Sequence, residues 1–239
     1  MTLQDAPSET STMPADPTTF KLLVFDWDGT LMDSIGTIVA CTQSAIRELE
    51  LGALPEATIR GTIGLGLRET IEILSPGCDE ALFGRILECY RKHWVSTYRD
   101  APLLFAGVRE MLRELAEAGY LLAVATGKSR RGLDYALEQT GLGELFHATR
   151  TADESFSKPH PQMLLDILDE LGVHPGDAVM IGDTTYDLEM ARSARTHAVG
   201  VCTGGHGREE LMRFEPIACL EQVVELVPWL AERGSVVPA

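Results

Sequence analysis

Three short apolar segments, each ending at polar residues, most constrain the fold of this chain. They are residues 21–25, 121–125 and 178–181. Runs of this length, rich in aliphatic residues and without polar alternation, are typical of strands that are buried on both faces of a parallel sheet. Residues 198–201 form a fourth, weaker strand candidate.

Helical periodicity fills the gaps between these segments. Apolar residues recur at helical spacing over 108–115, 133–137 and 164–171, and a glycine suited to ending a helix follows each run. Strands that alternate with helices imply βαβ units, so we predict an α/β fold with a doubly wound, Rossmann-like parallel sheet. Ligands of such folds bind outside the carboxyl ends of the strands. The residues at those ends are Asp26, Asp28, Thr126 and Asp183.

Residues 34–103 interrupt this alternation. Their apolar residues recur at helical spacing, and no strand-like run is present. We therefore predict a helical cap domain over 34–103, inserted after the first strand and lying over the mouth of the sheet. The Rossmann-like core would then consist of 19–33 and 104–239. Residues 1–18 are rich in small and polar residues and have almost no large apolar side chains, so we predict a disordered tail.

The composition narrows the functions that this chain can have. The formal net charge is −16, and an acidic surface repels nucleic acid and anionic membranes, so we expect neither as a partner. No apolar run approaches the roughly 20 residues of a membrane span, and no signal peptide is recognisable. The five cysteines are scattered without CxxC spacing, so we expect reduced thiols and a cytoplasmic protein.

Two pairs of carboxylates lie at the predicted strand ends. Asp26 and Asp28 are two residues apart, which points both side chains to one side if the strand continues, and such a pair can divide nucleophilic attack and proton transfer. The alternative is a plain turn, since Asp and Gly are common turn residues. Asp183 and Asp187 offer hard oxygen ligands suited to Mg²⁺, or they serve the start of the next helix, and both roles can coexist.

Three further residues carry weaker signals. Thr126 offers a hydroxyl, and Gly127 allows the backbone to approach a ligand closely, although most Thr-Gly pairs are only turns. Lys158 lies in a segment of little apolar character between the second and third apolar runs. A lone lysine is ordinarily a solvated surface charge, but here it can balance a nucleophile and a phosphate.

Taken together, these segments resemble the haloacid dehalogenase superfamily. The four segments that carry the resemblance are Phe25-Asp26-Trp27-Asp28-Gly29-Thr30-Leu31, Thr126-Gly127-Lys128, Lys158-Pro159-His160-Pro161 and Gly182-Asp183-Thr184-Thr185-Tyr186-Asp187. They occur in the family's order over about residues 20–227. The predicted insertion resembles the helical type-1 cap, and the branch that the chain looks most like is the phosphoglycolate-phosphatase-like group.

The resemblance implies a magnesium-dependent phosphatase that acts on a small phosphorylated metabolite. Asp26 would form an aspartyl-phosphate, and Asp28 would protonate the leaving alcohol and then activate water. Mg²⁺ would be held by Asp26, the backbone carbonyl of Asp28 and Asp183, with Asp187 in support. Thr126, Gly127 and Lys158 would bind the phosphoryl group. Neutralising charge and positioning the reactants are what phosphoryl transfer requires.

The substrate and the reaction type stay open at this point. Arg68, in a glycine-rich cap segment, can pair with a substrate carboxylate or phosphate, or it can simply face water at a helix start. A sugar-phosphate mutase keeps both aspartates but usually carries a histidine soon after the first motif, whereas the first histidine here is His93. A pyrophosphatase or nucleotidase is a further alternative, and a catalytically silent binding protein is another. We expect a monomer or a homodimer.

Overall fold

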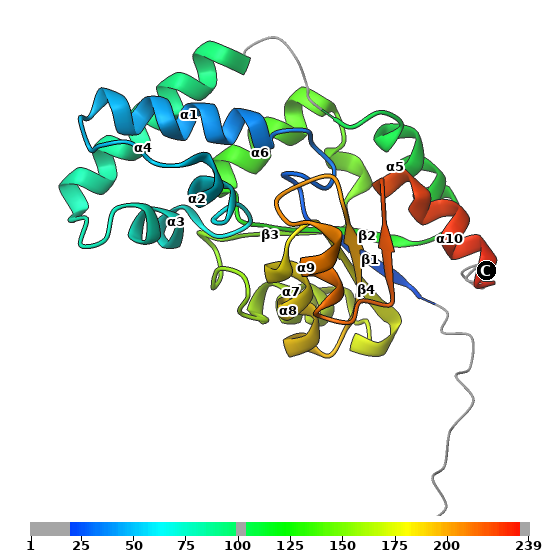
Figure 1. The fold of residues 1–239 in the computed structure, drawn as a ribbon. Helices are drawn as coiled ribbons and strands as arrows, with labels where there is room; N and C mark the ends of the chain where they lie inside the picture. Colours follow the sequence, from blue (N-terminus) through cyan, green and yellow to red (C-terminus); the bar gives the residue numbers. More distant parts are fainter. Residues whose placement is uncertain (1–19, 99–103, 235–239) are drawn as a thin grey trace, which may run out of the picture.

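A six-stranded, wholly parallel sheet forms the centre of the molecule in the computed structural model, which describes residues 20–98 and 104–234 (Figure 1). The strand order is β3-β2-β1-β4-β5-β6. The strands are β1 (Leu22–Phe25), β2 (Leu121–Thr126), β3 (Ala148–Thr151), β4 (Ala178–Gly182), β5 (His197–Val201) and β6 (Ala218–Leu220). The predicted tail, 1–18, lies outside the described residues. The sheet confirms the doubly wound parallel fold expected from the sequence.

Helices cover both faces of this sheet. On one face lie α5 (Val108–Glu117), α6 (Arg130–Thr140) and α10 (Leu226–Glu232), and on the other lie α7 (Gln162–Leu171) and α8 (Thr185–Ala194), with α9 (Arg208–Met212) beside β5 and β6. Successive side chains of a strand point to opposite faces, so Leu23 and Phe25 enter one core whereas Leu22 and Val24 enter the other. This two-sided burial explains why the inner strands are continuous apolar runs.

The two edge strands, β3 and β6, were not predicted from the sequence. β3 carries Thr149 and Arg150 at its centre, and both are only partly buried. β6 has only three residues. Neither forms an apolar run, because each pairs with a neighbour on one side only. Short 3-10 turns at Gly143–Leu145, Pro175–Asp177 and Val223–Glu225 complete the core.

The insertion between β1 and β2 begins with four helices that stand beside the sheet (Figure 1). They are α1 (Ile35–Glu48), α2 (Glu56–Arg60), α3 (Leu67–Leu74) and α4 (Glu80–Tyr98). Their small apolar core includes Val39, Ile59 and Leu74. This arrangement confirms the helical insertion after the first strand, while residues 99–103, where we predicted its end, lie outside the described residues. Within the described part of the chain, no helix is both long and apolar enough to span a membrane.

The cap contacts the core through the loop between α2 and α3. The Tyr186 hydroxyl donates a hydrogen bond to the carbonyl of Gly61 at 2.7 Å, and the backbone N–H of Gly66 donates to Ser157 Oγ at 2.7 Å. Gly127 at the end of β2 lies directly under this loop. A Cβ atom added to Gly127 would overlap the carbonyl oxygens of Gly64 and Leu65. The space that we expected Gly127 to leave for a ligand is therefore also used by the cap loop.

We predict that Gly127→Ala prevents the cap from seating on the core. The added methyl group meets backbone atoms, which cannot rotate away as a flexible side chain can. We expect kcat/KM to fall roughly 100-fold, the scale of a 1 Å misplacement in an active site. The melting temperature of the core should change little. Gly84→Ala, on α4 where no atom lies within 4 Å of the added Cβ, is the control and should leave kcat/KM unchanged. Equal activity of both variants would show that this contact is not required.

Candidate active site

Asp26 and Lys158 form a buried ion pair at the carboxyl end of β1. The backbone N–H of Asp26 donates to the carbonyl of Ile181 at 2.9 Å, which holds the residue in line with β4. Lys158 Nζ lies 2.7 Å from Asp26 Oδ1 and 2.6 Å from Asp187 Oδ1. The Lys158 side chain is 0% exposed. Lys158 is thus not the solvated surface charge that a lone lysine usually is.

Three buried carboxylates converge at this place. They belong to Asp26, Asp183 and Asp187, and one oxygen of each lies within 4.8 Å of the others. Asp187 is at the start of α8, where its Oδ2 accepts hydrogen bonds from the backbone N–H and the hydroxyl of Thr184. Asp187 therefore orders the helix start, as one of its two predicted roles requires, and its other oxygen contacts Lys158.

Two residues that were given no role in the sequence analysis hold the carboxylate of Asp183 from two sides. The Thr30 hydroxyl donates to its Oδ1 at 2.7 Å, and the N–H of Gly205 donates to its Oδ2 at 2.7 Å. The backbone of Gly204 passes so close that an added Cβ would overlap this carboxylate. The glycine pair after β5 was the available signal in the sequence, but only the fold brings it beside Asp183.

This cluster fits a divalent cation. With all groups ionised, three carboxylates and one ammonium leave two negative charges in excess, inside the protein where such an excess is costly. Asp26 Oδ2 is fully buried and has no hydrogen-bond partner among the described residues. Buried polar atoms nearly always have a partner, so this oxygen is available as a ligand. Oxygen-rich sites built from a few carboxylates are what Mg²⁺ prefers.

The same charge excess shifts the acid–base behaviour of the site. Burial raises the pKa of Asp26 well above its usual value, against the lowering effect of Lys158 and with further raising by Asp187 and Asp183. Burial alone lowers the pKa of Lys158, but Asp187 and Asp26 outweigh it and raise that pKa, so the ammonium stays charged. Burial, followed by repulsion from Asp187, raises the pKa of Asp183 to about 7.

Asp28 is turned away from the three carboxylates toward the cap. Its Oδ1 accepts a hydrogen bond from the Ser34 hydroxyl at 2.6 Å. Lys128 Nζ contacts both of its oxygens, at 2.8 and 2.9 Å, and lies 4.9 Å from the ring centroid of Trp94 on α4. Lys128 belongs to the second motif, but the sequence analysis gave it no role, because spacing along the sequence does not show that its side chain reaches Asp28.

A cavity of about 360 Å³ opens between the core and the cap. Asp26, Asp28 and Thr126, three of the four strand-end residues singled out in the sequence, line its floor together with Gly127, and Thr126 is 1% exposed. The fourth, Asp183, is not among the lining residues. The remaining walls come from α1, α3, α4, α6 and the cap loop. A molecule in this cavity therefore meets the nucleophile candidate, the second aspartate and the cap together.

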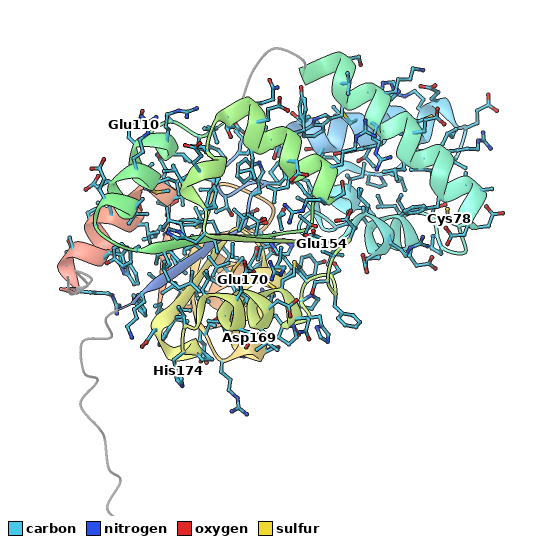
Figure 2. All side chains as sticks on the ribbon, turned by 180° about the vertical axis from the view of Figure 1, so that it is seen from behind. Cys78, Glu110, Glu154, Asp169, Glu170 and His174 are labelled. Carbon is cyan, nitrogen blue, oxygen red and sulfur yellow. The ribbon has the colours of Figure 1, made fainter. Side chains whose placement is uncertain are left out.

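Arg68 does not join the other predicted site residues. Its side chain is 61% exposed, pairs with Glu80 at 2.8 Å and lies outside the cavity lining. Arg130 is likewise absent from the cavity lining; its Nη2 lies 2.6 Å from Glu154 Oε2, and Glu154 lies at the end of the core nearest the cap in Figure 2. Trp27, between the two aspartates of the first motif, is fully buried and packs in the core.

Comparison with known proteins decides the family. The model of the haloacid dehalogenase-like hydrolase family matches residues 23–201 of the chain. This chain belongs to that family. The probable phosphatase IndB of Dickeya dadantii is 37% identical over 210 residues, covering 86% of this chain and 91% of that protein. A phosphoglycolate phosphatase of Mesorhizobium japonicum is 31% identical over 217 residues, covering 89% of this chain and 95% of its own.

A solved structure agrees with this assignment. The crystal structure of a haloacid dehalogenase-like hydrolase from Bacteroides fragilis superposes with a TM-score of 0.78 at 25% identity. The match covers 87% of this chain and 99% of that one. Sheet and helical cap therefore follow the architecture of this family of hydrolases.

We predict that Mg²⁺ stabilises the protein more at pH 8 than at pH 5. In the metal-free protein the pKa of Asp183 is about 7, above its ordinary 3.8, so the folded protein favours the protonated carboxyl. The stability that this carboxyl contributes is fully present below pH 3.8 and is lost as the pH rises through 7. At pH 8 the ionised cluster binds Mg²⁺, and a concentration of 100 Kd adds about 2.7 kcal/mol. At pH 5 protons compete with the ion. Calorimetric unfolding with and without Mg²⁺ measures both effects.

Two variants serve as controls for this experiment. Asp183→Asn should abolish the Mg²⁺ effect at both pH values, whereas Asp169→Asn, an exposed carboxylate on α7, should preserve it. A melting temperature that responds to Mg²⁺ equally in all three proteins would place the ion elsewhere.

Proposed function

We propose that this protein is a Mg²⁺-dependent phosphatase that hydrolyses a small phosphomonoester through an aspartyl-phosphate on Asp26. The observation that carries the proposal is the state of the Asp26 carboxylate. One oxygen is held by Lys158 at 2.7 Å, and the other is buried without a hydrogen-bond partner among the described residues, at the floor of the cavity. A carboxylate that is fixed in position and partly unsolvated is suited to attack phosphorus.

In the first step an oxygen of Asp26 bonds to phosphorus as the bond from phosphorus to the ester oxygen breaks. Asp28 gives its proton to the departing alcohol oxygen. In the second step water attacks phosphorus, and Asp28 takes a proton from that water. The bond between phosphorus and the Asp26 oxygen breaks, which releases phosphate and restores Asp26 as a free carboxylate. Ser34 and Lys128 orient Asp28 for these transfers.

The remaining site residues position the phosphoryl group. Thr126 lies at the end of β2 and lines the floor beside Asp26, where its hydroxyl can bind a phosphoryl oxygen, with Gly127 next to it. Lys158 balances the charge of Asp26 before and after phosphorylation. Mg²⁺, held by Asp26, Asp183 and the backbone carbonyl of Asp28 and supported by Asp187, would neutralise the phosphoryl oxygens.

The named relatives support phosphatase chemistry but differ in what their names specify. One is a probable phosphatase and the other a phosphoglycolate phosphatase. We therefore propose a small phosphorylated metabolite as substrate, a class that contains phosphoglycolate-like esters. The exposed position of Arg68 gives no support to a carboxylate contact at that residue.

We predict that Asp28→Asn releases one p-nitrophenol per protein from p-nitrophenyl phosphate and then stalls. A nitrophenolate leaves without a proton, so Asp26 can still be phosphorylated, but the water that should hydrolyse the intermediate lacks its base. Stopped-flow absorbance records the burst and the steady rate that follows, which we expect to fall about 100- to 10,000-fold.

Asp26→Asn should remove both the burst and the steady rate. Asp33→Asn replaces an exposed carboxylate of the same loop and should behave as wild type. Phosphate release that survives Asp26→Asn would contradict the proposed nucleophile. Isomerisation of a sugar phosphate without net phosphate release would favour the mutase, and pyrophosphate as the best substrate would favour the pyrophosphatase.

A further inference from the structure

The cap side of the cavity is predominantly apolar. Several cap residues that line the cavity are only partly buried. They include Ile38, Leu65, Leu67, Leu87, Tyr90 and Trp94. Deeper lining residues such as Ile71 and Ile86 are apolar as well. Apart from the phosphoryl site at its floor, the cavity thus offers hydrocarbon and aromatic surface.

Three threonine hydroxyls in this wall are already used within the protein. Thr62 Oγ1 donates to the carbonyl of Ile59 at 2.8 Å, Thr70 Oγ1 to that of Thr62 at 3.3 Å, and Thr140 Oγ1 to that of Ala136 at 2.7 Å. A hydroxyl bonded to its own helix shows mainly its methyl group to the cavity. These threonines therefore add little polarity to the wall.

Positive charge is nearly absent from the depth of the cavity. The cationic lining residues are Arg91, Lys128 and Arg131. Arg91 and Arg131 are exposed, and Lys128 is engaged by both oxygens of Asp28. A carboxylate or a second phosphate that packs against the buried part of this wall would lose its hydration without gaining an ion pair there, because Arg91 and Arg131 lie at exposed positions.

Tyr90 belongs to the aromatic part of this wall. Its ring stacks on Trp94 with the centroids 6.0 Å apart, next to the Lys128–Asp28 pair. Burial, with additional repulsion from Asp28 and Cys41, raises the pKa of the Tyr90 hydroxyl well above 10. The hydroxyl thus stays neutral and adds no charge to the cavity.

Resting on the proposed phosphatase function, we propose that the substrate is a phosphate ester of a predominantly apolar alcohol, whose only charged part is the phosphate. The phosphoryl group binds at Asp26 and Lys158, and the hydrocarbon part of the alcohol packs against Leu87, Tyr90 and Trp94. A cavity of about 360 Å³ is within the range of small-molecule sites, and a glycolate group would fill only a small part of it.

A series of n-alkyl phosphates from methyl to hexyl tests this proposal, because the leaving alcohols are similar in acidity and differ mainly in apolar surface. We expect kcat/KM to rise about two- to fourfold for each added methylene, as burial of a methylene predicts. Isobutyl phosphate, close in shape to 2-phosphoglycolate, should be the better substrate of the two. A flat series, or a preference for 2-phosphoglycolate, would overturn the proposal while leaving the phosphatase function intact.

Leu87→Gln tests the wall itself, with Leu82→Gln as its matched control. Both leucines are partly exposed on α4, but only Leu87 lines the cavity. The rise of kcat/KM along the series should flatten in Leu87→Gln and persist in Leu82→Gln, and thermal unfolding verifies that both variants are folded. The same slope in both variants would show that α4 does not contact the alcohol.

Titration calorimetry with n-alkylphosphonates and Mg²⁺ separates this proposal from the phosphatase function. These compounds are not hydrolysed, so their binding does not depend on turnover. Affinity that rises with chain length supports the apolar site even if no ester is hydrolysed, in which case only the phosphatase proposal fails. Affinity independent of chain length overturns the apolar site.

Discussion

The buried contact of Lys158 with Asp26 and Asp187 is the interaction on which the rest of the site depends. The carboxylates of Asp26, Asp187 and Asp183 are buried and repel one another, and a single ammonium only partly balances their charge. Burying such charges costs several kcal/mol per ion unless partners are precisely placed. The remaining charge excess suits a divalent cation, and we propose that the site binds this cation together with a phosphoryl group.

The fold supplies the precision that this arrangement requires. Parallel pairing of β1 with β4 sets Phe25 opposite Ile181, so Asp26 and Asp183 emerge at the same edge of the sheet. The order of the strands reverses between these two strands, where ligands of doubly wound sheets bind. The cap then closes the edge from above through the Gly61 and Gly66 contacts. In the function that we propose, the core carries out the chemistry, whereas the cap recognises the leaving group.

The features that could be predicted from the sequence are those that depend on local residue patterns. Apolar runs that end next to Asp26, Thr126 and Asp183 located β1, β2 and β4 and the side of the sheet where their carboxyl ends lie. The edge strands β3 and β6 form no apolar run and were not predicted. Spacing did not show that Lys128 reaches across to Asp28, nor that Gly204 passes beside Asp183. Those contacts join segments that only the complete fold brings together. Arg68, for which the sequence left a substrate contact and a solvent-facing helix start open, is exposed and pairs with Glu80.

The central claim is that Asp26 is phosphorylated during turnover, and peptide mass spectrometry of an acid-quenched reaction tests it most directly. Acid preserves an acyl phosphate long enough for digestion. We predict that the peptide containing Asp26 gains the mass of one phosphoryl group, that this gain depends on Mg²⁺, and that it is absent from Asp26→Asn. Steady phosphate release with an unmodified Asp26 peptide, or a phosphoryl group on another residue, would contradict it.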